Sequence, residues 1–211
     1  SVFVAPLGTD PDDLAATTGS DAFGRAREEL EAQVSGRAFL ARVDRIELSK
    51  NVLRGFDAYE ALLDAEPHRH GRVVFGAFVY PSRGGVAAYD TYRRAVEERV
   101  AAINDRFGTD DWTPVLYDPH DDYPRSMAAL SLADVVLVNP IRDGLNLVAM
   151  EAMIINRRDG QLVLSPEAGC WDALGPAAWR ADPFDVGATA GALAAALDAP
   201  AEERRRRAEE L

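Results

Sequence analysis

Short apolar runs alternate along the chain with longer stretches in which apolar residues recur at helical spacing. The pattern predicts strands at Val2–Leu7, Ala38–Val43, Val73–Tyr80, Pro114–Tyr117, Asp134–Asn139 and Gln161–Ser165. Several of these runs are apolar at nearly every position, which indicates a strand that is buried on both faces. Parallel sheets covered by helices contain strands of this kind.

The longer amphipathic stretches predict helices at Asp21–Val34, Lys50–Ala65, Val86–Phe107, Tyr123–Leu132, Leu145–Asn156 and Asp185–Leu197. Strands that alternate with helices indicate an α/β fold with a doubly wound, mainly parallel sheet and helices on both faces, that is, a Rossmann-like domain. We expect residues 1–35 to be a linker segment with a first helix, and residues 36–200 to be the domain. Residues 201–211 should begin a C-terminal helix.

The predicted C-terminal helix is rich in charge. Glu202 and Arg206 are four residues apart, as are Glu203 and Arg207, so ion pairs along the helix can support it. We interpret this segment as a charged helix that is exposed to solvent.

Composition excludes several classes of function. The 211 residues carry 23 Lys and Arg against 35 Asp and Glu, a formal charge of -12, which disfavours a nucleic-acid partner. One cysteine, Cys170, excludes a disulfide framework and a thiolate zinc site. No apolar run reaches the ~18 residues of a membrane span, and the start of the chain lacks the basic flank of a signal peptide. We expect a cytoplasmic protein without a membrane partner.

Polar residues follow the predicted strands, where open α/β sheets bind ligands. Arg45 and Lys50 come after the first long strand, and Ser49 could begin the next helix as its N-cap. The two cations suit a phosphate group, but they could equally pair with Asp44 and Glu47.

Two further segments follow strands. Arg83 stands before two glycines, a turn that could admit an anion or be an ordinary exposed turn. In the segment 143–151, Gly144 permits a tight turn into a helix, Asp143 can accept hydrogen bonds from hydroxyl groups, and Glu151 needs a polar partner such as a ribose diol. Alternatively, Asp143 caps the helix and Glu151 contacts an arginine.

Taken together, these segments resemble the C-terminal half of the trehalose-6-phosphate synthase family. The resemblance is collinear and extends over nearly the whole chain, through Arg42–Lys50, Ala58–Leu63, Pro81–Gly84, Trp112–Pro114, Asp143–Glu151, Leu164–Ser165 and Ala168–Gly169.

The resemblance implies a retaining glycosyltransferase with two facing Rossmann-like domains (the GT-B fold), in which this chain is the donor-binding half. Such an enzyme of trehalose biosynthesis would transfer glucose from UDP- or GDP-glucose to glucose 6-phosphate, and this half alone should be inactive. It implies a missing N-terminal Rossmann-like domain, a possible homo-oligomer of the full enzyme, and neither a cofactor nor a metal.

The family's site residues carry over by motif position. Arg45 and Lys50 would bind the donor diphosphate and, with Asp143, would be the catalytic residues. Asp143 would bond to the donor glucose, and Glu151 to the ribose. The donor site would also include Gly144, Asn146, Leu147 and Val148, and Arg83 would reach the acceptor phosphate.

The sequence departs from the family pattern in the phosphate loop. Where the family has Leu-Asp-Tyr-Ser-Lys-Gly, this chain has Ile46-Glu47-Leu48-Ser49-Lys50-Asn51, and Gly85 replaces an acid. Two alternatives therefore stay open: a related transferase with glycerol 3-phosphate or an aminocyclitol phosphate as acceptor, and a non-catalytic nucleotide-sugar-binding module.

Other polar clusters have simpler interpretations. The acidic runs at 10–13, 109–111 and 118–122 suit solvated loops and helix starts better than a metal site. His68 and His70 are expected at the surface, and His120 could contact the nucleotide base. Cys170 is expected to be a packed residue rather than a nucleophile, because no histidine is near it in the sequence.

Overall fold

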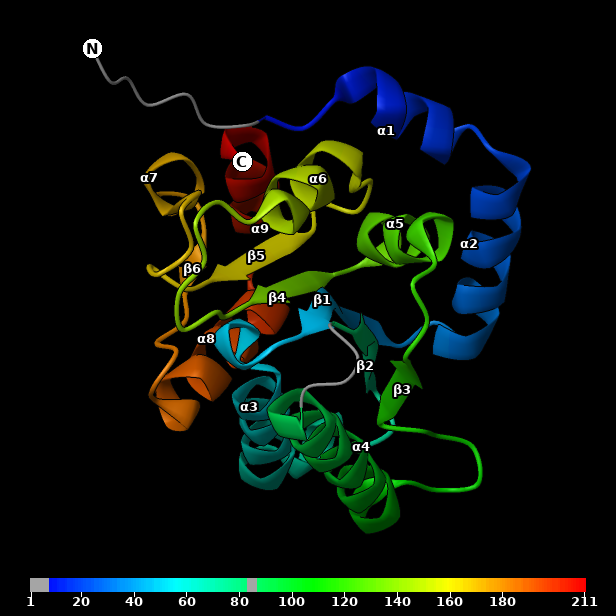
Figure 1. Ribbon diagram of the computed structural model, residues 1–211, viewed down its shortest axis with the longest axis vertical. Coiled ribbons are helices and arrows are strands. Elements are labelled where there is room, and N and C mark those ends of the chain that lie inside the picture. The colour runs from blue at the N-terminus through cyan, green and yellow to red at the C-terminus, as the bar shows by residue number, and fades with distance from the viewer. Residues whose placement is uncertain (1–7, 83–86) are drawn as a thin grey trace.

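A computed structural model describes residues 8–82 and 87–211. In these residues one sheet contains six strands, all parallel, in the order β3-β2-β1-β4-β5-β6. The strands are β1 (Ala38–Ile46), β2 (Val73–Pro81), β3 (Val115–Asp118), β4 (Val135–Val138), β5 (Gln161–Leu164) and β6 (Trp179–Arg180). The chain winds outward from β1 to β3 and then returns to β4, so the winding direction reverses between β1 and β4 (Figure 1).

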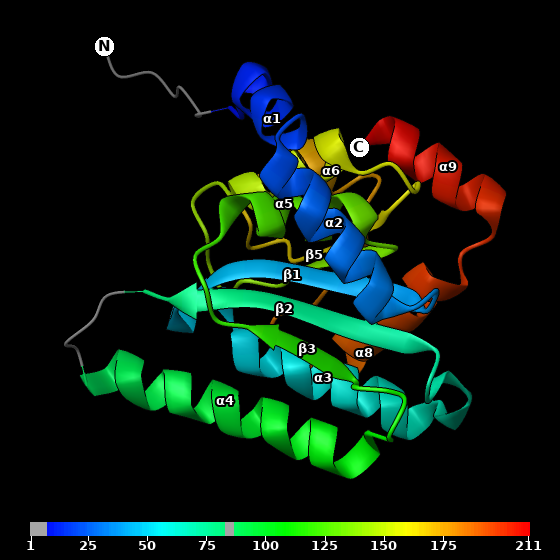
Figure 2. The ribbon, with the colours of Figure 1, turned by 90° about the vertical axis from the view of Figure 1, so that its right-hand side faces the viewer.

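Helices cover both faces of the sheet. On one face lie α3 (Val52–Ala65), α4 (Ala87–Phe107) and α8 (Val186–Asp198), and on the other lie α1 (Pro11–Thr18), α2 (Asp21–Val34), α5 (Tyr123–Leu132) and α6 (Leu147–Ile155) (Figures 1 and 2). The short helix α7 (Trp171–Leu174) precedes β6, and α9 (Ala201–Glu210) lies beside α6 (Figure 2). This is the doubly wound, Rossmann-like arrangement that the sequence pattern predicts.

Burial explains why the central strands are almost continuously apolar. All four residues of β4 and of β5 are buried, as are residues 39–44 of β1, because helices pack on both faces. Several of the helices that pack on the sheet begin at side-chain caps. Ser20 accepts a hydrogen bond from the Phe23 N–H at the start of α2, and Asp122 accepts one from the Arg125 N–H at the start of α5.

The predicted helices Asp21–Val34 and Tyr123–Leu132 have the observed bounds of α2 and α5. Three elements were not predicted, and each has a weak pattern. In α1 only Leu14 is buried, α7 is a single turn, and β6 has two residues. The predicted strand Val2–Leu7 lies outside the described residues. Among the described residues, no helix combines the length and apolar character needed to cross a membrane.

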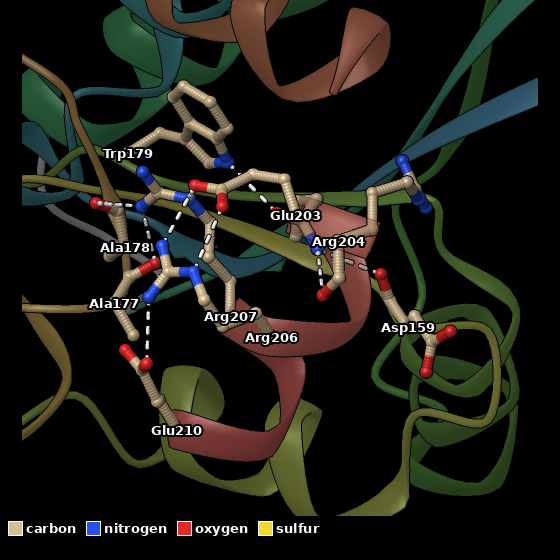
Figure 3. Close-up of polar contacts among 10 residues, drawn as sticks. Asp159, Ala177, Ala178, Trp179, Glu203, Arg204, Arg206, Arg207 and Glu210 are labelled. Carbon is tan, nitrogen blue, oxygen red and sulfur yellow. Dashed lines mark hydrogen bonds and ion pairs between the residues drawn. The ribbon is translucent and has the colours of Figure 1, made fainter. Parts of the chain in front are cut away.

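The C-terminal helix α9 is solvent-facing as expected, since none of its residues is buried, but two of its arginines also contact the rest of the fold, and Figure 3 shows the contacts of Arg207. Arg207 donates to the Ala177 carbonyl at 2.8 Å, and its guanidinium carbon lies 4.0 Å from the centre of the Trp179 ring. Arg204 donates to the Asp134 carbonyl at 3.1 Å. Two of the four consecutive arginines therefore fix α9 to the edge of the fold, and their charges serve structure rather than solubility.

The ion pairs along α9 differ in part from those expected. Glu203 and Arg207 form the predicted pair at 2.7 Å. Arg206 does not pair with Glu202; it pairs with Glu203 at 2.9 Å and with Glu210 at 2.7 Å. Glu203 thus bridges two arginines, and their hydrogen bonds lower its pKa to about 2.

Candidate functional site

The carboxyl ends of β1 and β4 lie next to each other at the reversal point, which is where open α/β sheets bind ligands. After β1 the chain passes through the short 3-10 helix η1 (Leu48–Lys50) into α3, and after β4 a loop leads into α6. The two connections touch, since the Ile141 N–H donates to the Ser49 carbonyl at 2.8 Å. The fold therefore brings together two segments that the sequence places about a hundred residues apart.

Lys50 lies between two carboxylates at this edge. Its Nζ is 2.6 Å from Oδ2 of Asp143 and 3.3 Å from Oδ1 of Asp44. Burial lowers the pKa of Lys50, but the two carboxylates outweigh burial and leave this pKa above its ordinary value. Burial likewise raises the pKa of Asp143, but the hydrogen bond from Lys50 leaves it below the ordinary value. Both groups are therefore charged near neutral pH, and the cation is already oriented before any ligand arrives.

Arg45 is the one exposed residue of β1, near the carboxyl end of the strand. Its guanidinium forms an ion pair with Glu47 at 3.0 Å, and its side chain is half exposed. Glu47 is fixed in turn by the Ser82 hydroxyl, which donates to Oε1 at 2.6 Å. The alternative in which Arg45 and Lys50 pair with Glu47 and Asp44 is thus present in the structure. Lys50 has the additional partner Asp143 at the shorter distance.

Arg45 and Lys50 both lie within electrostatic reach of the Tyr80 hydroxyl, near the end of β2. Burial and Asp121 leave the pKa of Tyr80 above its ordinary value, and Arg45 and Lys50 oppose this rise. This region also lies at the carboxyl edge of the sheet. An anion placed there would meet cations from the end of β1 and from η1.

The loop before α6 ends in a tight connection to Asp143. Asn146 has the left-handed φ of 69° and caps the helix, because its Oδ1 accepts a hydrogen bond from the Ala149 N–H at 3.0 Å. The amide of Asn146 also donates to Oδ2 of Asp143 at 3.0 Å. Helix geometry leaves the N–H groups of Leu147 and Val148 without an intrahelical acceptor. Asp143 is therefore not the cap, and it stands beside a helix N-terminus that suits an anion.

Glu151 lies half-buried in α6, and the Tyr123 hydroxyl at the start of α5 is near enough to affect its pKa. Burial raises the pKa of Glu151, while Tyr123 lowers it. Burial and the charge of Glu151 raise the pKa of Tyr123 to about 12, so the phenol is neutral near pH 7. Among the described residues, no arginine is near enough to affect the pKa of Glu151. The carboxylate could therefore accept hydrogen bonds from a ribose diol.

An open hollow of about 470 Å³ lies next to Asp143. It is lined by Arg142, Asp143, Gly144, residues 166–169, Trp171 and Asp172. The two loops that form it are packed together: the Gly169 N–H donates to the Asp143 carbonyl at 2.9 Å, and a Cβ on Gly169 would overlap the backbone of Gly144. Glycine at 169 is therefore required for the walls of the hollow to meet.

The turn into α3 differs from the one expected from the sequence. Ser49 is not the N-cap of α3; it lies in η1, and α3 begins after Asn51, which has a left-handed φ of 61°. Asparagine tolerates this conformation, so the replacement of the family's glycine leaves the turn intact. Arg83, with Gly84 and Gly85, lies outside the described residues.

The histidines and the cysteine lie apart from this cluster or are simply packed. His70 contacts the Leu63 carbonyl and stacks near Trp112, whereas His68 is exposed beside Glu66. His120 pairs with Asp118 at 2.7 Å. Burial raises the pKa of Cys170 to about 11, which suits the expected packed thiol rather than a nucleophile. In the described part of the chain, no group of three or more His, Cys, Asp or Glu side chains could bind a metal.

Two polar residues that support the site, Arg42 and Asn139, were not singled out from the sequence. Arg42 is fully buried and donates to Oδ1 of Asn139 at 2.6 Å, and it pairs with Asp44 at 3.0 Å. Asn51 donates to the carbonyls of Asn139 and Pro183, at 3.0 and 2.8 Å. A charged residue inside the apolar run 38–43 was the available signal for Arg42.

Comparison with known proteins gives a consistent family. The family model for glycosyltransferase family 20 matches residues 1–211. The chain is 36% identical over 209 residues to the bifunctional trehalose-6-phosphate synthase/phosphatase of Thermoproteus tenax, covering 98% of this chain and 28% of that protein. It is 36% identical over 204 residues to the trehalose-6-phosphate synthase of Citrobacter koseri, covering 95% of this chain and 43% of that protein.

Solved structures agree. The α,α-trehalose-phosphate synthase (UDP-forming) of Burkholderia xenovorans, in complex with glucose-6-phosphate, superposes with a TM-score of 0.90 at 34% identity and covers 97% of this chain and 46% of that chain. The E. coli protein bound with UDP-2-fluoro glucose gives a TM-score of 0.88 at 34% identity, with 97% and 46% coverage. The chain spans less than half the length of these relatives. It belongs to glycosyltransferase family 20, the family of the trehalose-6-phosphate synthases, and matches the C-terminal part of its members.

Proposed function

We propose that this chain binds a nucleoside-diphosphate glucose at the Lys50–Asp143 edge, as the donor-binding half of a retaining glycosyltransferase that forms trehalose 6-phosphate from glucose 6-phosphate. The observation that carries the proposal is the contact between Lys50 and Asp143, which joins the end of η1 to the start of α6 at the reversal point. The relatives support it, since one structure contains glucose-6-phosphate and another contains UDP-2-fluoro glucose.

In the proposed complex the diphosphate lies between Lys50 and the N-terminus of α6. The ammonium group of Lys50 then forms an ion pair with the phosphates in place of part of its contact with Asp143. The free N–H groups of Leu147 and Val148 donate further hydrogen bonds to the phosphates. Negative charge grows on the diphosphate as the sugar–phosphate bond breaks, so Lys50 and Arg45 stabilise the leaving group most in the transition state. Asp143, released from Lys50, can accept hydrogen bonds from the glucose hydroxyls.

The ribose is assigned to Glu151. Its carboxylate is half-buried and close enough to the Tyr123 hydroxyl for that group to affect its pKa, so a ribose hydroxyl would supply a donor of the same kind. The acceptor phosphate is assigned to Arg83, and the remaining acceptor contacts to a second Rossmann-like domain of the whole enzyme. A half-site orients no acceptor, so this chain alone should transfer glucose poorly.

Calorimetric titration of the chain with UDP, GDP and their glucose conjugates tests the proposal. We expect UDP and UDP-glucose to bind, and Lys50→Ala to weaken UDP by about 10- to 100-fold, the usual range for a lost charge-assisted contact. Arg205→Ala is the matched control, because Arg205 is an exposed cation on α9. A folded chain that binds none of the four ligands would refute the proposal.

A further inference from the structure

A buried arginine lies directly beneath the proposed donor site. Arg42 is on β1, and its side chain is fully buried. Residues two apart on a strand share a face, so Arg42 and Asp44 point to the same side of the sheet, toward α3. An arginine is almost never fully buried without a specific set of partners, which makes this position informative.

The partners of Arg42 all belong to the site. Its guanidinium donates to Oδ1 of Asn139 at 2.6 Å and to the backbone carbonyl of Lys50, and it pairs with Oδ2 of Asp44 at 3.0 Å. The first partner follows β4, and the second is the residue that carries the candidate phosphate-binding amine. Arg42 therefore links the two connections that form the site.

The charges explain why an arginine is needed there. Lys50 has two carboxylates within 3.3 Å, and both compete for its one positive charge. Asp44 is buried, and burial outweighs the lowering by Arg42 and Lys50, so its pKa stays above the ordinary value. If Arg42 were absent, Asp44 would have Lys50 as its remaining cation. With Asp44 ionised at mildly alkaline pH, the cluster of Asp44, Lys50 and Asp143 would then carry one net negative charge. A diphosphate is repelled by such a cluster.

The neighbouring helix is built to leave room for this side chain. A Cβ on Gly55, which is buried in α3, would clash with Nη1 of Arg42. Glycine in a helix interior costs about 1 kcal/mol relative to alanine, so its presence here fits a need for space. The Nε of Arg42 has no hydrogen-bond partner within the described residues. The hydrogen bonds of Arg42 are therefore incomplete and do not by themselves explain why an arginine is buried here.

We infer that Arg42 is a positioning residue of the donor site: it neutralises Asp44 so that the charge of Lys50 remains available to the diphosphate. The inference rests on the proposed function, since it concerns how the same site binds its diphosphate. Arg42 itself makes no contact with the donor. Its effect on binding passes through Asp44 and Lys50.

The test compares UDP with uridine, which has no phosphate, at mildly alkaline pH. Arg42→Met should weaken UDP binding by about tenfold or more, as expected for one uncompensated charge near the phosphates, and should change uridine affinity by less than about twofold. Adding Asp44→Asn to Arg42→Met should restore UDP affinity to within about threefold of the unchanged chain, because the competing carboxylate is gone. Asp44→Asn alone should bind UDP at least as tightly as the unchanged chain. Calorimetry measures UDP, and ligand-observed NMR measures uridine.

The controls separate this role from loss of stability. Tyr59→Phe removes a buried hydroxyl that contacts the Val73 and Pro114 carbonyls, away from the site, and should leave UDP affinity unchanged. Equal losses for UDP and uridine in Arg42→Met, or no recovery on adding Asp44→Asn, would overturn the inference.

If Arg42→Met alone does not fold, the double variant and Asp44→Asn still decide the question. Neither leaves an unpaired buried carboxylate at position 44, and weakened UDP binding in both would contradict the charge argument. If the unchanged chain binds neither UDP nor GDP nor their glucose conjugates, the proposed function fails; if it binds GDP rather than UDP, the same variants are compared with GDP and guanosine. If it binds UDP and the variants behave otherwise than stated, only the role of Arg42 fails.

Discussion

The space that Gly55 leaves for Arg42 can be tested by a single methyl group. Gly→Ala in the interior of a helix normally stabilises a protein by about 1 kcal/mol. At position 55 the added Cβ would clash with Nη1 of Arg42, so the guanidinium must move and lose its 2.6 Å hydrogen bond to Asn139. A hydrogen bond to a charged group contributes about 1.5–3 kcal/mol. The balance predicts that Gly55→Ala lowers the free energy of unfolding by about 0.5–2 kcal/mol.

Gly191 provides the matched control, because it lies in the interior of α8 and nothing is within 4 Å of the place that an added methyl group would occupy. We expect Gly191→Ala to raise the free energy of unfolding by about 0.5–1 kcal/mol, opposite in sign to Gly55→Ala. Urea unfolding followed by circular dichroism and tryptophan fluorescence measures both variants. If Gly55→Ala stabilises the chain as much as Gly191→Ala does, the account of Arg42 as a tightly enclosed side chain is wrong.

Three further predictions concern the connections around the site and the edge of the fold. Asn51→Gly keeps the left-handed turn but loses two amide hydrogen bonds to backbone carbonyls, so urea unfolding should show a loss of about 1–2 kcal/mol; an unchanged midpoint would contradict this. Arg207→Ala removes the cation that lies 4.0 Å from the Trp179 ring and should cost about 1–2 kcal/mol and change tryptophan fluorescence, whereas Arg205→Ala should stay within about 0.5 kcal/mol. Burial raises the pKa of Cys170 from 9.0 to about 11, so the neutral thiol stabilises the fold below pH 9.0 and this contribution is lost as the pH rises toward 11. At neutral pH a thiol reagent should therefore modify the folded chain at least ~100-fold more slowly than the unfolded chain. Equal modification rates would refute the burial of Cys170.

Much of the fold could be predicted because its strands and helices have strong, regular patterns. The run Val135–Val138 is apolar at every position and is buried at every position. The elements that were missed have no such signal: β6 has two residues, and α1 buries only Leu14. The contacts of Arg204 and Arg207 in α9 could not be predicted for a different reason. Whether a charged helix is solvated or docked depends on partners such as Trp179 and the Ala177 carbonyl, and these belong to a distant part of the chain.

The candidate site, like the fold, could be predicted from the sequence only in part. Residue types after strand ends predicted that Lys50 and Asp143 lie at one edge, because parallel strands bring their carboxyl ends together; Asn146 came only from the resemblance to the family. The pairing of these residues could not be predicted, since Lys50 had Asp44 near it in sequence but has Asp143 as its closer partner in space. The role of Arg42 could not be predicted for a related reason, because a buried charge is stable only with partners that folding brings to it.

The local charges of the site matter because the chain as a whole is strongly acidic. The chain has a formal charge of -12, so an anionic donor gains nothing from the protein's overall field and must be attracted locally. The central cluster is itself neutral, because Arg42 and Lys50 balance Asp44 and Asp143. Lys50 is thus ordered and charged in the absence of ligand, and the side-chain entropy of ordering it is already lost before the donor arrives. A diphosphate can then exchange places with Asp143 around an amine that scarcely needs to move, and the displaced carboxylate becomes free to accept hydrogen bonds from the sugar. One ion pair, supported from beneath by Arg42, would in this way prepare both the phosphate contact and the glucose contact.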